Sequence, residues 1–300
     1  MSFSLSGLPA FDYRQPASLK EALELLSAET AAQAYSGGTD LFPRIRSRQF
    51  HPHLLVDLKS IQDFPATQLT KTGELLINPQ ISLAHLLPWL HDFAGGEVLS
   101  SAILQLGTPS LRNRATLAGN LCNASPAADS IAPLMALNSR LVLQSCQTSR
   151  EVRVEDFLLS PGKTVCRQDE LLTAIILPIQ PANSRGVYLK IGRNRAADLS
   201  ICGVAVLLSP DESAVSGTKA EVVVSGANPI PIKILAAREY LAGYQPDQAV
   251  FQHTARLAAQ AVQPISDLRS SAAYRQAMVY ELTLQALTAC FTAFGEKPIR

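Results

Sequence analysis

The sequence predicts an α+β protein of two domains with a boundary near residue 180. Up to Leu177, short strand-like runs mix with amphipathic helices, whereas after residues 178–184 strands come first and helices follow. The segment between contains two prolines and several turn formers, which interrupt both periods. We therefore expect a first domain over residues 1–180 and a second over residues 185–300.

The first domain begins with a helix. Ser18 and Glu21 form a capping box, and leucines at helical spacing continue the helix over residues 19–28. A strand over residues 33–35 then runs into a glycine-containing turn. After it we expect a helical turn, strands over 54–58, 75–77 and 140–143, and helices over 83–87, 97–106 and 130–137.

The second domain has a simpler pattern, in which three strand-like runs precede three helical ones. We expect a small sheet backed by helices. The expected strands cover residues 187–191, 201–208 and 220–224, and the expected helices cover residues 232–242, 251–261 and 272–291.

The amino-acid composition limits which classes of function the protein can have. Of the 300 residues, 47 % are hydrophobic and 17 % charged, which is enough apolar material for one or two real cores. A net charge of +1 leaves no electrostatic footprint for nucleic acid or an anionic membrane. We expect no signal peptide and no membrane span, since no apolar run is long enough. Five scattered cysteines indicate a cytoplasmic chain without disulfides, and their spacing predicts no metal site.

The first candidate site is the turn after the strand at residues 33–35. Adjacent glycines allow positive φ and a close approach to a ligand. Successive amides in such a turn can bind phosphate oxygens, with hydroxyls as extra donors. A plain tight turn is the alternative, and the chain has no G-x-G-x-x-G fingerprint that would indicate a Rossmann site. The segment reads Ala34-Tyr35-Ser36-Gly37-Gly38-Thr39-Asp40.

The second candidate is the polar segment over residues 107–129, which lies between apolar helices. A polar loop of this length inside a compact domain usually has a purpose. Thr116, Asn120 and Asn123 can donate and accept hydrogen bonds, and Asp129 can hold a sugar hydroxyl. The alternative is a surface loop in which Asp129 only caps the following helix.

Three segments together carry a family resemblance. They are the glycine turn, the run from Arg112 to Ser130, and Tyr188-Leu189-Lys190-Ile191-Gly192-Arg193 followed by Asp198. In this order and at these separations they resemble the FAD-binding, medium subunit of molybdenum hydroxylases. That family includes bacterial xanthine dehydrogenase, carbon monoxide dehydrogenase and 4-hydroxybenzoyl-CoA reductase. The resemblance covers nearly the whole chain.

The resemblance implies an FAD-binding domain of the p-cresol methylhydroxylase type. Its two α+β subdomains would cover about 1–56 and 57–180, with FAD between them, and a C-terminal domain with a small antiparallel sheet and helices would follow. The chain would pass electrons from [2Fe-2S] clusters of a small partner subunit through FAD to NAD+, a quinone or another acceptor. A large partner subunit would hold the molybdenum cofactor, in a dimer of heterotrimers.

The resemblance also assigns roles to the two candidate segments. Residues 34–40 would wrap the FAD pyrophosphate through backbone amides. Further contacts to phosphate and ribityl groups would come from Thr116, Gly119, Asn120 and Asn123. The usual Gly-Gly-Asn is Ala118-Gly119-Asn120 here. Ala118 is tolerable if Gly119 makes the close approach, whereas a need for positive φ at Ala118 would shift the loop.

Other residues would surround the rest of the cofactor. By the same resemblance, Asp129 would hold ribose or ribityl hydroxyls, and Leu106 and Gly107 would lie near the isoalloxazine. Leu172 would make a backbone contact. Lys190 would lie near the polar edge of the flavin, where a cation favours the reduced, anionic form.

The flavin would do the redox chemistry, so we expect no acid, base or nucleophile in this chain. No histidine or cysteine stands where a covalent flavin bond would form, and non-covalent FAD is expected. Cys122 stands alone in a loop without an insertion, so the extra iron–sulfur cluster of the reductase subfamily is not expected. Two alternatives are a self-contained flavin oxidase, which usually adds a larger cap domain, and an assembly subunit that has lost FAD, against which the intact glycines argue.

Overall fold

The computed structural model describes residues 7–194 and 198–295 and has the mixed helix and sheet content that the sequence predicts. A parallel sheet opens the fold, and α1 (Leu19–Ala28) packs its apolar face on it. The Ser18 hydroxyl accepts the Glu21 N–H as expected, while the Glu21 carboxylate accepts the N–H of Ala17 instead of Ser18. In order across the sheet, the strands are β1 (Asp12–Arg14), β3 (Leu54–Asp57) and β2 (Ala32–Tyr35). Helix α2 (Leu41–Arg46) follows β2.

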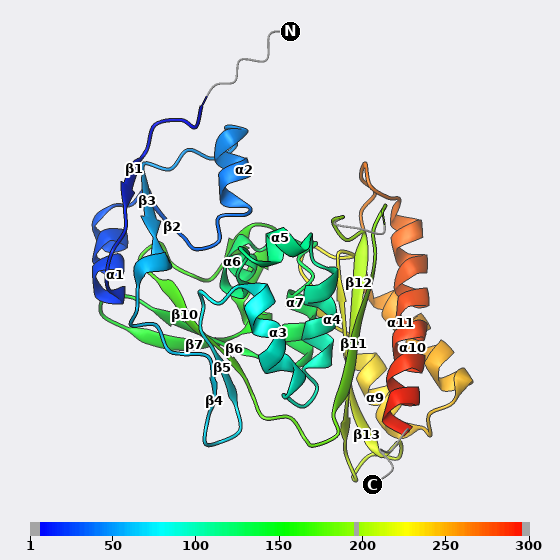
Figure 1. Ribbon diagram of the computed structural model, residues 1–300. Coiled ribbons are helices and arrows are strands. Elements are labelled where there is room, and N and C mark those ends of the chain that lie inside the picture. The colour runs from blue at the N-terminus through cyan, green and yellow to red at the C-terminus, as the bar shows by residue number, and fades with distance from the viewer. Residues whose placement is uncertain (1–6, 195–197, 296–300) are drawn as a thin grey trace.

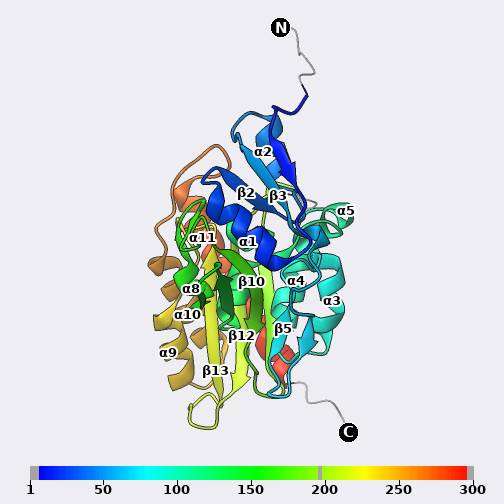
Figure 2. The same cartoon turned by 90° about the vertical axis from the view of Figure 1, so that its left-hand side faces the viewer.

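An antiparallel sheet forms the middle of the molecule, below the first sheet in Figure 2. Its order is β4 (Gln68–Leu69), β5 (Leu75–Ile77), β10 (Leu171–Leu177), β6 (Arg140–Gln144) and β7 (Ser149–Arg153). A large core joins this sheet to α3 (Leu83–His91), α4 (Glu97–Gln105) and α7 (Ile131–Ala136). The shorter elements are a 3₁₀ turn (Leu58–Ser60), α8 (Val154–Phe157), β8 (Leu158–Ser160) and β9 (Lys163–Thr164).

Residues 107–129 are not the irregular loop that the sequence indicated. They contain α5 (Pro109–Arg112) and α6 (Leu117–Asn123). Each helix begins at a threonine cap: Thr108 Oγ1 accepts the N–H of Leu111, and Thr116 Oγ1 accepts the N–H of Gly119. The caps satisfy N–H groups at the helix starts. Because the residues are small and polar, the sequence shows no helical periodicity that would predict these helices.

The C-terminal sheet is antiparallel, as predicted, with the order β11 (Arg185–Ile191), β12 (Cys202–Pro210), β13 (Thr218–Ser225) and β14 (Ile232–Lys233). The helices that follow are α9 (Leu235–Gly243), α10 (Gln248–Ala261) and α11 (Ala272–Gly295). The first of them begins three residues later than expected, because Ile232 and Lys233 pair with β13 as an edge strand.

This sheet is buried on both faces. Ala205 and Leu207 of β12 join the large core beside α4 and α7, whereas Val204 and Val206 pack against the C-terminal helices. Figure 1 shows the sheet standing between these two groups of helices. The alternation follows from the period of two along a strand. One core therefore runs across the linker and fixes the C-terminal sheet against the first domain. No helix in the described ranges is long and apolar enough to cross a membrane.

Candidate functional site

The two adjacent positions of the turn after β2 require glycine for different structural reasons. Gly38 has φ +71°, which side chains rarely adopt. At Gly37, a Cβ would lie 2.2 Å from the carbonyl oxygen of Arg114. A plain tight turn accounts for Gly38 but not for Gly37, whose bare Cα lets the turn touch the backbone between α5 and α6. The two candidate segments of the sequence therefore meet.

The turn leaves a row of hydrogen-bond donors open. Among the described residues, none of the backbone N–H groups of residues 36–41 has an acceptor. The hydroxyls of Ser36 and Thr39 likewise have no protein partner within the same part of the chain, and both residues line a cavity. Unpaired amides that are close in sequence and face one space form a site for an anion.

The cavity has a volume of about 490 Å³ and lies between the glycine turn, residues 106–129 and the C-terminal domain. All but two of the predicted FAD contacts line it, so the structure brings together residues that are far apart in the chain. These lining residues are Ala34, Tyr35, Ser36, Gly37, Gly38, Thr39, Asp40, Leu106, Gly107, Thr116, Gly119, Asn120, Asn123 and Asp129. Their contacts with FAD stay predictions.

Leu172 and Lys190 are not on the cavity wall. Leu172 lies on β10 opposite Leu143 and is buried in the large core. Lys190 lies on β11, one layer behind the wall. The backbone contact expected of Leu172 and the place of Lys190 near the flavin stay predictions.

Ala118 fits the loop without strain. It lies inside α6, and the non-glycine residues with positive φ among those described do not include it. A Cβ at Gly119 would lie 3.0 Å from Thr116 Oγ1, so Gly119 is the residue that makes the close approach, here to its own helix cap. The absence of the usual first glycine does not require the loop to shift.

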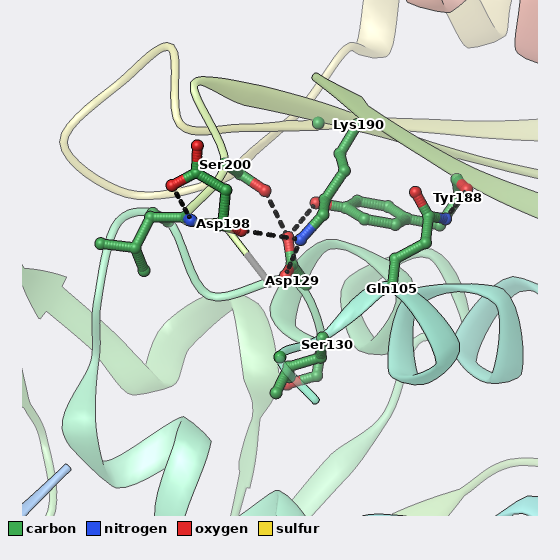
Figure 3. A network of polar contacts seen from close by, with 12 residues as sticks. Gln105, Asp129, Ser130, Tyr188, Lys190, Asp198 and Ser200 are labelled. Atoms are coloured by element: carbon green, nitrogen blue, oxygen red, sulfur yellow. Dashed lines mark hydrogen bonds and ion pairs between the residues drawn. The ribbon is translucent and has the colours of Figure 1, made fainter. Parts of the chain in front are cut away.

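Asp129 joins the cavity wall to the C-terminal domain (Figure 3). Its Oδ1 accepts the Tyr188 hydroxyl at 2.9 Å and the Ser200 hydroxyl at 2.5 Å, and its Oδ2 lies 2.7 Å from Lys190 Nζ. The carboxylate has about four acceptor positions, and these donors occupy three of them. The capping alternative is wrong, because Ser130 is the N-cap residue of α7 and Asp129 makes no cap hydrogen bond.

One of the donors to Asp129, the Tyr188 hydroxyl, stays protonated. Burial, and then the neighbouring carboxylate, raise the pKa of Tyr188 well above its ordinary value, so its hydroxyl stays a neutral donor. Gly203 makes room for this ring, since a Cβ there would lie 2.1 Å from the Tyr188 oxygen. Lys190 Nζ also donates to the carbonyl of Asp198 at 3.3 Å. The ammonium thus connects two cavity-lining residues and is balanced by a carboxylate.

A second buried carboxylate supports the glycine turn from the N-terminal sheet. Asp57 Oδ2 accepts the hydroxyls of Tyr35 at 2.9 Å and Tyr13 at 2.6 Å, and lies 2.9 Å from Lys59 Nζ. Burial opposes ionisation of Asp57, but these donors outweigh it and hold its pKa below the usual value. Tyr35, the last residue of β2, is thereby fixed where the turn begins. Sequence reasoning missed this network, because the sequence does not reveal pairing across parallel strands.

The wall also includes residues that the sequence did not single out. Arg44 and Phe50 line it together, with the guanidinium carbon 5.5 Å from the ring centroid. The Arg44 side chain is exposed and also borders the cavity. Asp198 and Leu199 enter from the C-terminal domain. Only the resemblance, which included Asp198, pointed to this segment.

Comparison with known families decides which family the chain belongs to. Residues 9–180 match the model described as FAD binding domain in molybdopterin dehydrogenase. This chain belongs to that family. Residues 187–290 match the CO dehydrogenase flavoprotein C-terminal domain, so family matches cover both parts of the fold. The resemblance carried by the sequence motifs is confirmed, and the chain is the FAD-binding component of an oxidoreductase.

Individual relatives are similar to this chain over nearly their full lengths. The chain is 29 % identical over 276 residues to the nicotine 6-hydroxylase medium subunit of Paenarthrobacter nicotinovorans, which covers 92 % of this chain and 95 % of the relative. It is 26 % identical over 286 residues to the xanthine dehydrogenase FAD-binding subunit of Escherichia coli O157:H7, covering 95 % and 97 %. A carbon monoxide dehydrogenase structure from Hydrogenophaga pseudoflava superposes with a TM-score of 0.89 at 25 % identity, covering 96 % and 99 %. This similarity confirms the predicted fold class.

Proposed function

We propose that this chain holds one non-covalent FAD in the cavity and passes electrons from iron–sulfur clusters of a small partner subunit to an external acceptor. The observation that carries the proposal is the row of unpaired N–H groups over residues 36–41, which borders a cavity of about 490 Å³. A dinucleotide pyrophosphate needs such donors, and backbone amides supply them without a lysine. When bound, the flavin supplies the redox chemistry.

The chain's own residues then bind and orient the cofactor. The amides of residues 36–41 would hold the pyrophosphate, with the Ser36 and Thr39 hydroxyls as further donors. Asn123, whose side chain has no protein partner among the described residues, is available for ribityl or phosphate oxygens. Asp129 has one acceptor position left for a sugar hydroxyl. Its main structural role is to hold the cavity wall in place against β11.

Lys190 acts from behind this wall. Because its ammonium is paired with Asp129 at 2.7 Å, the flavin would meet a nearly neutral pair and not a free cation. We therefore propose that Lys190 orients Asp129 and the Asp198 carbonyl, and that its effect on the flavin is smaller than the resemblance implied.

The partners belong to the proposal as well. A large subunit with the molybdenum cofactor would oxidise the substrate, and a small subunit with [2Fe-2S] clusters would deliver the electrons, in a dimer of heterotrimers in the cytoplasm. The described residues contain no cluster of three or more His, Cys, Asp or Glu side chains able to hold a metal. NAD+, a quinone or another carrier would accept the electrons.

Purification of the tagged chain from its native host, with the subunits that accompany it, tests this function. We expect a yellow protein that releases about one FAD per copy of this chain on acid precipitation, together with molybdenum and iron in the accompanying subunits. A complex without flavin, which takes up none on incubation with FAD, would contradict the proposal. Flavin that stays with the precipitated protein would contradict non-covalent binding alone.

A further inference from the structure

We propose that Arg275 is a positioning residue that holds two loops of the C-terminal domain against the cavity wall. The inference rests on the proposed function, because the ligand of the wall is FAD. Arg275 lies in the first turn of α11 and is 2 % exposed, which is unusual for an unligated arginine. A buried guanidinium needs acceptors, and its acceptors show which parts of the chain it joins.

The guanidinium binds three separate segments. One terminal nitrogen, Nη1, donates to the carbonyl oxygens of Ile201 at 2.5 Å and Gly226 at 2.8 Å. The other, Nη2, lies 2.8 Å from Oδ1 of Asp267. Arg275 therefore ties the beginning of β12, the turn after β13 and the loop before α11 to one planar group.

The first of these segments leads directly to the cavity. Ser200, which precedes Ile201, donates its hydroxyl to Asp129. Asp198 and Leu199, just before it, line the cavity. The Ile201 carbonyl that Arg275 binds is thus adjacent in the chain to Ser200, whose hydroxyl binds Asp129.

The second segment contacts the part of the cavity wall that residues 106–129 form. The N–H of Gly226 donates to the carbonyl of Pro126 at 3.1 Å, and the neighbours Ser125 and Ala127 line the cavity. Gly226 has φ +73°, and a Cβ there would lie 2.8 Å from the carbonyl oxygen of Ile201. The two carbonyls that Arg275 binds belong to loops in direct contact with each other.

Arginine suits this place better than lysine. Its fork of donors reaches several acceptors in fixed directions, whereas an ammonium acts as a point charge on a flexible stem. Asp267 is not exclusive to Arg275, because Arg269 also binds it, with Nη2 2.8 Å from Oδ2. Among the described residues, the Arg269 side chain makes no hydrogen bond to Ile201 or Gly226, so Arg269 provides a matched control from the same ion cluster.

The test compares the wild-type complex with Arg275→Met, Arg275→Lys and Arg269→Met. Flavin is removed from each and FAD is titrated back, well below the melting temperature of each protein. The readouts are the dissociation constant of FAD, the visible circular dichroism of the bound flavin and the melting temperature. A residue that only stabilises the fold would lower the melting temperature without changing the flavin spectrum or the affinity.

We expect Arg275→Met to weaken FAD binding by roughly tenfold and to change the flavin dichroism, and Arg275→Lys to lie between it and the wild type. Arg269→Met should retain the wild-type affinity and spectrum. Unchanged affinity and dichroism in Arg275→Met would overturn the inference, and so would an equal loss in Arg269→Met. If Arg275→Met does not fold, Arg275→Lys decides by the same two readouts. A wild-type complex that binds no FAD would instead overturn the proposed function, and this inference with it.

Discussion

Gly37 and Asp129 are the residues on which the cavity wall depends most directly. Gly37 allows contact with the carbonyl of Arg114, and Asp129 gathers donors from the C-terminal domain. The sequence identified both as candidates, the adjacent glycines for positive φ and a close approach to a ligand, and Asp129 as a sugar ligand or a helix cap. In the structure the positive φ belongs to Gly38, and the close approach of Gly37 is to the backbone of Arg114.

Gly37→Ala tests the close approach. The added methyl would have to move the turn away from Arg114, and backbone cannot yield as a flexible side chain can. We expect the affinity for FAD to fall roughly tenfold, measured by fluorescence titration of the flavin-free complex. Gly243→Ala is the matched control, because a Cβ there meets open space at ordinary φ. Equal affinity of Gly37→Ala and wild type would contradict the packing argument.

Lys190→Met tests the buried pair. Removing the ammonium leaves the Asp129 carboxylate, which is only 7 % exposed, with two hydroxyl donors. We expect the free energy of unfolding to fall by about 3 kcal/mol, and the double variant Lys190→Met/Asp129→Asn to recover part of that loss. Denaturant unfolding measures both. Strictly additive losses in the double-mutant cycle would show that the two groups do not interact.

At the scale of elements, most strands and helices follow from periodicity and end signals. The cap at Ser18 and the continuous apolar run of β12 are strong local signals, and both elements form as predicted. Several short elements were not predicted, among them α5, α6 and β14. They are too short for a period to appear, and they form because caps or a neighbouring strand satisfy their backbone groups.

An ion pair between β7 and the residue before β10 gives a pH prediction. Arg150 on β7 binds Glu170 through two hydrogen bonds of 2.8 Å, and this contact, against the effect of burial, holds the pKa of Glu170 below its usual value. The lower pKa in the folded state means that the stabilisation is complete above the unfolded value of about 4.3 and is lost as the pH falls through the folded value.

The free energy of unfolding of Glu170→Gln at pH 7 should therefore be about 2 kcal/mol lower than that of the wild type. Between pH 6 and pH 3, the melting temperature of Glu170→Gln should fall less than that of the wild type. Thermal unfolding across this range measures the difference. Glu24→Gln serves as the control, since Glu24 is 59 % exposed beside Lys20. Parallel pH profiles of Glu170→Gln and wild type would refute the role of this pair.

At the scale of the whole molecule, the cavity is built from three parts of the chain that local pattern does not connect. The glycine turn, the segment around α6 and the end of the β11–β12 hairpin meet because one core runs from the middle sheet through α4 and α7 into the C-terminal sheet. Motif spacing therefore found the first two parts, whereas Leu199 and Arg275 depend on tertiary packing alone. The same packing pairs Lys190 with Asp129, at 2.7 Å between Nζ and Oδ2.

The most direct test of the central claim is a cryo-electron microscopy or crystal structure of the complex with FAD bound. We expect the pyrophosphate oxygens within hydrogen-bond distance of backbone nitrogens in residues 36–41, with the flavin inside the cavity lined by Leu106, Asp129 and Leu199. FAD density elsewhere on the chain, or a pyrophosphate away from the glycine turn, would contradict the account.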